Sequence, residues 1–139
     1  MEAKMKKGPV TIILLALALI LAACSGGGAS QSSDPSAIIE ALESAWNAKD
    51  VDAAMALFAE DAVERNGMGT YEGRDAIRNI YKFVMDYHHT FMDCQNYQVN
   101  GNAISYDCIY TDKDGAYEMD ESYDAVIEDG KIKTNMLVE

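Results

Sequence analysis

The spacing of apolar residues changes twice along the chain. An apolar run with a single polar residue, Thr11, occupies residues 10–23, helical spacing dominates residues 36–85, and alternation begins at about His88. Helical spacing gathers side chains on one face of a helix, whereas alternation gathers them on one face of a strand. The sequence therefore predicts a helical first part and a strand-rich second part.

Three helices are predicted. An Asp-Pro-Ser sequence at 34–36 offers a capping side chain and a first-turn proline for a helix over about 36–48. A Lys-Asp-Val-Asp corner at 49–52 ends that helix and caps a second one, which is expected to reach about Phe58. Gly-Arg-Asp at 73–75 begins the third, whose apolar stripe consists of Ile77, Ile80, Tyr81, Val84 and Met85.

A short strand is predicted at 63–65, and longer strands at about 88–99, 103–111, 116–127 and 131–138. The Asn-Gly pair at 100–101 is a strong signal for a two-residue hairpin turn. Helices first and an antiparallel sheet gathered at the end indicate the α+β class.

The first 23 residues have the composition of an export signal: basic residues, a short apolar run and small residues before Cys24. The Leu-Ala-Ala-Cys ending resembles the lipobox of bacterial lipoproteins, which implies cleavage before Cys24 and acylation of that residue. An ordinary membrane anchor with an incidental cysteine is the alternative. We expect a signal peptide at 1–23, a flexible Gly/Ser tether at 24–35 and one domain at 36–139, lipid-anchored on the extracytoplasmic side of a bacterial membrane.

Charge narrows the possible partners of the domain. Without the first 23 residues, 22 acidic and 8 basic side chains remain, a net charge of −14. A domain with this negative charge repels the phosphate backbone of nucleic acids. Nucleic acid is therefore not an expected partner.

Four motifs in order resemble the SnoaL-like, nuclear transport factor 2-like superfamily: the corner AWNAKDVDAAMALFAEDAV, then YEGRDAI, a Gly-Asn-Ala-Ile hairpin start, and VIEDGKI. The resemblance covers about residues 37–139. It implies a cone of the cystatin-like roll type, in which a strongly curved antiparallel sheet wraps around the third helix. The first two helices would close the cone around an apolar pocket. The superfamily contains isomerases, cyclases, dehydratases and binding-only members, so the resemblance leaves the activity open.

Ketosteroid isomerase, a member of this superfamily, gives one chemistry to compare. By resemblance, its proton-shuttle acid falls on Asn66, its oxyanion Tyr on Leu42, and its oxyanion Asp near Tyr123, while a supporting Tyr is kept as Tyr81. An amide cannot take up a proton. The resemblance therefore argues against isomerase chemistry of this type.

The same resemblance turns an aromatic set toward the pocket: Trp46, Phe58, Tyr81, Tyr106, Tyr110 and Tyr123, with Asn66 at its mouth. Pairing through a two-residue turn at 100–101 would also turn Phe91, Asp93, Gln95 and Tyr97 inward. Phenols among apolar walls suit a ligand with rings and a few oxygens, although inward aromatics can equally be plain core.

Asp93 is the acid proposed for acid–base chemistry, with Glu121 as a weaker second, and Tyr81 or Tyr123 would position an oxygen. A solvated Asp93 is the alternative. His88 and His89 lack partners at metal-ligand spacing, so no metal site is expected. The sequence contains no P-loop, dinucleotide fingerprint or Cys-x-x-Cys motif, and no cofactor is expected.

Cys94 and Cys108 remain once Cys24 is assigned to lipid. Export favours a disulfide between them, whereas an ideal two-residue turn would place Cys94 opposite Asp107. A single bulge would bring the two cysteines opposite each other, so the question stays open.

Three functions remain at this point. The first is a tethered module that binds a small apolar or aromatic ligand. The second is a SnoaL-like isomerase or lyase that uses Asp93, and the third is a non-catalytic domain that dimerises through its sheet face.

Overall fold

A computed structural model describes residues 34–87, 90–116 and 118–139. The expected export signal, Cys24 and most of the tether lie outside the described residues, as do His88 and His89. The described chain forms these elements: α1 (Pro35–Asn47), α2 (Val51–Ala56), β1 (Phe58–Asn66), β2 (Gly69–Glu72), α3 (Arg74–Tyr87), β3 (Phe91–Asn100), β4 (Ala103–Thr111), β5 (Glu118–Glu128) and β6 (Lys131–Leu137). No helix in these ranges has the length and apolarity needed to cross a membrane.

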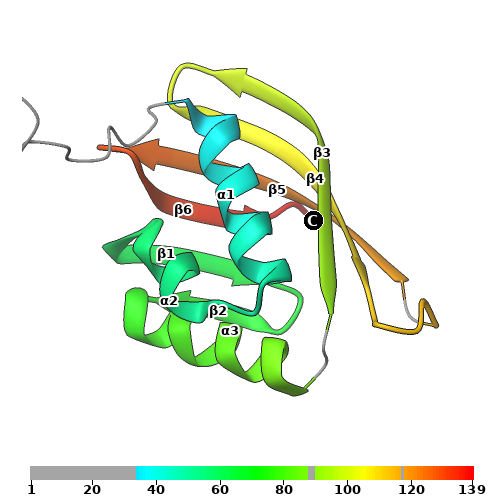
Figure 1. Ribbon diagram of the computed structural model, residues 1–139. Coiled ribbons are helices and arrows are strands. Elements are labelled where there is room, and N and C mark those ends of the chain that lie inside the picture. Colours follow the sequence, from blue (N-terminus) through cyan, green and yellow to red (C-terminus); the bar gives the residue numbers. More distant parts are fainter. Residues whose placement is uncertain (1–33, 88–89, 117) are drawn as a thin grey trace, which may run out of the picture. The chain divides into compact units, whose positions relative to one another are not determined.

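The strands form one curved sheet in the order β2-β1-β6-β5-β4-β3 (Figure 1). Neighbouring strands are antiparallel except β1 and β6, which run parallel. The helices lie on one face of this sheet, where α1 packs against β3 and β4 and α3 packs against β1 and β2. The predicted α+β fold with a curved sheet is confirmed, with the parallel β1–β6 pair as the difference.

The corner between α1 and β1 forms as its polar residues predict. The Asp34 side chain accepts a hydrogen bond from the Ser36 amide (3.1 Å) and caps α1. The Asp50 side chain accepts one from the Ala53 amide (2.9 Å) and caps α2.

The second helix is shorter and the first strand longer than predicted. Helix α2 ends at Ala56, and Phe58 begins β1 instead of ending the helix. The reason is pairing with the end of the chain: the Ile132 amide donates to the Leu57 carbonyl (2.8 Å), and Phe58 pairs with Ile132. The strand therefore covers residues 58–66, whereas only residues 63–65 were predicted as a strand. The longer strand presents several side chains to the interior.

A bulge in β3 changes which side chains face the interior. Gln95 pairs with Asp107 and Gln98 with Ser105, so β3 contains one extra residue, and Asn96 at the bulge has a φ of 58°. The bulge reverses the facing predicted for 91–95: Met92 and Cys94 are buried, whereas Asp93 is exposed. It also pairs Cys94 with Cys108, and these residues form a disulfide.

Candidate functional site

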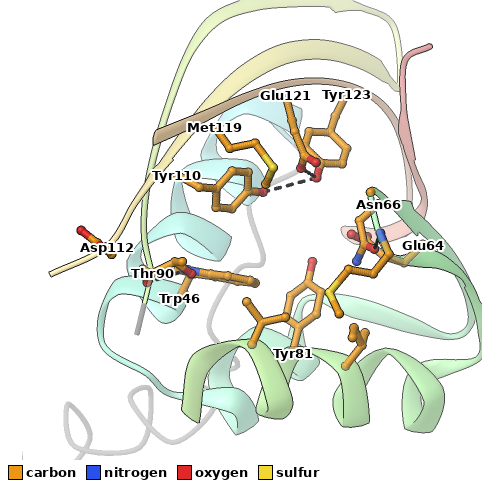
Figure 2. A pocket seen from close by; sticks show the side chains of 14 residues that line it. Trp46, Glu64, Asn66, Tyr81, Thr90, Tyr110, Asp112, Met119, Glu121 and Tyr123 are labelled. Carbon is orange, nitrogen blue, oxygen red and sulfur yellow. Dashed lines mark hydrogen bonds between the residues drawn. The ribbon is translucent and has the colours of Figure 1, made fainter. Parts of the chain in front are cut away.

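A pocket of about 690 Å³ opens between the helices and the concave face of the sheet (Figure 2). This volume lies in the ordinary range of small-molecule sites, roughly 300–1,000 Å³. Its lining comes from α1, β1, α3 and the strands β4 and β5, and combines aromatic and apolar side chains with a few polar groups: Trp46, Glu64, Asn66, Gly67, Met68, Ile80, Tyr81, Val84, Thr90, Tyr110, Asp112, Met119, Glu121 and Tyr123.

Most of the residues expected in the pocket come together there. Five of them line it: Trp46, Asn66, Tyr81, Tyr110 and Tyr123. Phe58 and Tyr106 are buried behind this lining instead. Phe58 packs edge-on against Tyr81, with ring centroids 5.6 Å apart, and Tyr106 stacks on Tyr123 at the same separation.

Asp93 does not belong to the site, which corrects the expectation that it supplies the acid. The bulge at Asn96 turns Asp93 to the outer face of β3, where it is exposed. An exposed carboxyl has water around it and does not line the pocket, so Asp93 cannot act on a ligand held there.

Glu64 is the buried carboxylate of the pocket and is a residue that was not predicted from the sequence. It lies on β1, is only 2% exposed, and accepts a hydrogen bond from Asn135 Nδ2 (2.9 Å) on the neighbouring β6. Asn135 Oδ1 in turn accepts one from the Tyr106 hydroxyl (2.7 Å). Because Asn135 uses both ends of its amide, its orientation and that of Glu64 are fixed together.

The surroundings of Glu64 favour its neutral form. Burial raises the pKa of Glu64 to about 8; hydrogen bonds from Asn135 and Tyr81 oppose this rise, and the charge of Glu121 adds to it. A carboxyl group with a pKa near neutral can give or take a proton at physiological pH. This is the property expected of a general acid or base.

A second carboxylate, Glu121, lies on β5 at the more open end of the pocket and is half-buried. The Tyr123 hydroxyl donates a hydrogen bond to Glu121 Oε2, and the Tyr110 hydroxyl lies 3.5 Å from that of Tyr123. Burial raises the pKa values of Tyr81, Tyr110 and Tyr123 above the ordinary phenol value, so these residues stay neutral hydrogen-bond donors.

Gly67, in the turn between β1 and β2, approaches Glu121 closely. A Cβ at this position would lie 3.0 Å from Glu121 Oε1. The absence of a side chain at 67 therefore lets the Glu121 carboxylate reach across the end of the pocket.

A signal for Glu64 was present in the sequence. Residues 64 and 66 lie two apart on one strand, so they share a face. Placing Asn66 at the pocket mouth therefore implied that Glu64 also turns inward. The predicted strand at 63–65 was too short to make this relation visible.

The described residues contain no group of three His, Cys, Asp or Glu side chains that could hold a metal ion. The polar groups that the described residues bring to the pocket are three carboxyl groups, three phenols, the Thr90 hydroxyl and the amide of Asn66.

Comparison with protein families gives a match to the SnoaL-like domain over residues 39–134. The chain belongs to the SnoaL-like domain family. The predicted resemblance is thereby confirmed at the level of the family. Comparison with curated proteins gives no match.

Several solved structures share the fold of this chain. A cystatin-fold protein from Novosphingobium aromaticivorans is 20% identical, with a TM-score of 0.67 over 76% of this chain and 98% of its own. A protein from Sinorhizobium meliloti, provisionally assigned as a polyketide cyclase, is 20% identical, with a TM-score of 0.67 over 73% and 94%. Another with that provisional assignment, from Xanthomonas campestris, is 20% identical, with a TM-score of 0.61 over 74% and 87%. At such identities the likeness establishes the fold alone.

Proposed function

We propose that this SnoaL-like domain is a proton-transfer enzyme that acts on a small ring compound with a carbonyl group. The observation that carries the proposal is Glu64, a buried carboxyl group that lines an aromatic pocket and has a pKa near 8. The presence of Asn66 at the position of the shuttle acid favoured a module that binds a ligand without catalysis, since an amide cannot shuttle a proton. Glu64, on the same face of β1, supplies the group that Asn66 cannot.

The proton transfer uses the two forms of Glu64. With a pKa of about 8, roughly a tenth of the Glu64 carboxyl is ionised at pH 7. The carboxylate removes a proton from the carbon next to the carbonyl, which yields an enolate and neutral Glu64. Neutral Glu64 then returns the proton, either to the same carbon or to another position of the ligand.

Phenol hydroxyls supply the stabilisation that the enolate oxygen needs. The Tyr110 hydroxyl has only a long contact of 3.5 Å with Tyr123, so it can turn to a ligand oxygen. A neutral phenol that donates a hydrogen bond in a pocket with little water stabilises an oxyanion strongly.

The relatives provisionally assigned as polyketide cyclases support this reaction class. Closing a ring in a polyketide chain by carbon–carbon bond formation requires an enolate, and an enolate forms by removal of a proton next to a carbonyl. The proposal takes from them the type of step only, not their substrate.

The test is hydrogen exchange on 1-tetralone, a bicyclic ketone, in D2O. We expect the protein to accelerate deuterium incorporation next to the carbonyl, measured by NMR, and Glu64→Gln to reduce the rate about 100-fold or more. Binding of 1-tetralone, followed by the fluorescence of Trp46, should change little, because Gln has the shape of the neutral acid. Asp93→Asn is the matched control and should exchange like the wild type. Equal exchange by wild type and Glu64→Gln would contradict the proposal.

We also propose that the domain is attached to the extracytoplasmic face of a bacterial membrane through acylated Cys24. Support comes from the Leu-Ala-Ala-Cys sequence and the Gly/Ser tether that follows it. Labelling of the chain with an alkyne analogue of palmitate should be lost in Cys24→Ala, and unchanged labelling would contradict the attachment.

A further inference from the structure

The pocket is lined by acidic side chains and by no basic ones among the residues that the structure describes. Among the described residues that line it, Glu64, Asp112 and Glu121 are acidic, and none is Lys, Arg or His. The domain carries the same excess, since 22 acidic residues face 8 basic ones after residue 23. Such a field attracts cations to the opening and repels anions.

Glu121 is placed to bind a cation directly. Its Oε2 accepts from Tyr123, while its Oε1 lies close to Gly67, a residue without a side chain. Met68, which is exposed and lines the pocket, lies in the same turn as Gly67, so this is the open end of the site. The hydroxyl ends of Tyr110 and Tyr123 lie beside Glu121 (Figure 2), and their oxygens can accept hydrogen bonds from a bound cation.

The other end of the pocket has an unused polar group. Thr90 lines the pocket and is 7% exposed, and its hydroxyl Oγ1 is buried without a hydrogen-bond partner. A buried hydroxyl without a partner is costly, and a ligand group can satisfy it. Thr90 lies beside Trp46, away from Glu121 and Tyr123 (Figure 2).

A positive charge lies at the Thr90 end. The Lys49 amino group donates to the Thr90 carbonyl and lies 4.6 Å from the centre of the Phe91 ring. A ligand cation at this end would be repelled, whereas one at the Glu121 end would not.

From these observations we infer that the pocket selects an organic cation: a ring compound whose protonated amine binds Glu121 and whose far end offers a hydrogen-bonding group to Thr90. This inference rests on the proposed function and adds the charge of the substrate to it. It predicts that an amine binds better than a neutral or anionic molecule with the same rings.

The experiment uses the purified full chain and four ligands with one bicyclic skeleton: 1-aminotetralin (a cation at neutral pH), 1-tetralol, 1-tetralone and 1,2,3,4-tetrahydro-1-naphthoate. Titration calorimetry should give about tenfold tighter binding of the amine than of the alcohol, and the carboxylate should bind weakest. Glu121→Gln should abolish the preference for the amine over the alcohol.

Asp120→Asn is the matched control. Asp120 is exposed on the opposite face of β5, so its removal changes the net charge equally without touching the pocket. A similar loss of preference in Asp120→Asn and Glu121→Gln would overturn the inference, because the effect would then come from the overall charge.

Thr90→Val tests the other end of the pocket. A hydroxyl on the aromatic ring of 1-aminotetralin should improve affinity in the wild type and lose that gain in Thr90→Val. If the alcohol binds as tightly as the amine while deuterium exchange on 1-tetralone is intact, the selection of a cation is contradicted and the proposed proton-transfer activity is retained. Absence of binding by all four ligands together with absence of exchange would overturn both.

Discussion

Glu64 and Glu121 face the same pocket from β1 and β5, and their surroundings differ. Glu64 is buried and held by the amide of Asn135, with a pKa raised to about 8. Glu121 is half-buried, accepts from Tyr123 and reaches toward the turn at Gly67. The difference teaches that one pocket can contain a carboxyl for proton transfer and another for charge recognition, because burial separates their properties.

The sheet places the two carboxyls in different cross-strand rows. Glu64 pairs with Asn135 on β6, which pairs with Ala125 on β5. Glu121 pairs with Cys108 on β4, which pairs with and is bonded to Cys94 on β3. Each row can therefore be changed with limited effect on the other.

The largest expected effect is on the pH dependence of stability. Glu64 has a pKa near 8 in the folded chain and about 4.5 when unfolded. Between these values the unfolded chain releases a proton that the folded chain keeps, so stability falls as pH rises. The full cost above pH 8 is on the order of 5 kcal/mol. Urea unfolding at pH 5 and 8.5 should show this fall in the wild type and its near absence in Glu64→Gln.

Glu121→Gln is the comparison for that measurement. It should retain most of the fall, because burial rather than the Glu121 charge is the main cause of the raised pKa of Glu64. An equal flattening of the pH profile in both variants would contradict the separation of the two carboxyls.

The disulfide row should contribute stability without pH dependence. Replacing Cys94 and Cys108 with Ala opens a loop with a sequence separation of 14, and about 3 kcal/mol of unfolding free energy should be lost at every pH. Urea unfolding at pH 5 and 8.5 without reductant checks this. A loss confined to the higher pH would mean that the disulfide also governs Glu64.

A smaller effect is expected at Asn135. Asn135→Leu removes the donor to Glu64 and the acceptor of the Tyr106 hydroxyl, both buried. The loss should be about 2 kcal/mol at pH 5. Because the Asn135 hydrogen bond lowers the pKa of Glu64, the pH midpoint of deuterium exchange on 1-tetralone should move upward. A downward shift of that midpoint would show that the amide does not stabilise the carboxylate.

The smallest expected effect on stability is at Gly67. Its φ is not in the left-handed region, so Gly67→Ala causes no backbone strain, and the side-chain end of Glu121 can move away from the added Cβ. Stability should change by less than about 1 kcal/mol, whereas the preference for 1-aminotetralin over 1-tetralol should fall several-fold. An unchanged preference would show that the position of Glu121 does not matter.

The fold could be predicted from the sequence because its signals are local. The change from helical spacing to alternation, the caps Asp34 and Asp50, and the hairpin turn between β3 and β4 each depend on a few neighbouring residues. The turn lies at 101–102, one residue later than predicted. The end of α2 was predicted two residues too late, because pairing of Phe58 with Ile132 joins positions far apart in the chain.

The candidate site could be predicted only in part. The family resemblance turned Tyr110 and Tyr123 inward, where they line the pocket. Asp93 was assigned to the wrong face of β3 because a single extra residue in this strand reverses the alternation. The residue types around Asn96 do not predict the bulge. The charge state of Glu64 depends on burial and on Asn135, which the sequence places 71 positions away.

The bulge at Asn96 determines which side chains of β3 face the interior between residues 91 and 95. Asn96 adds one residue to β3 before the hairpin turn. Because of this extra residue, residues 92 and 94 face the interior. Deletion of this one residue would exchange the two faces of the strand between 91 and 95, bring Asp93 inward and separate the cysteines. The disulfide between Cys94 and Cys108 therefore reports the alignment of β3 with β4, because the extra residue is what places the two cysteines opposite each other.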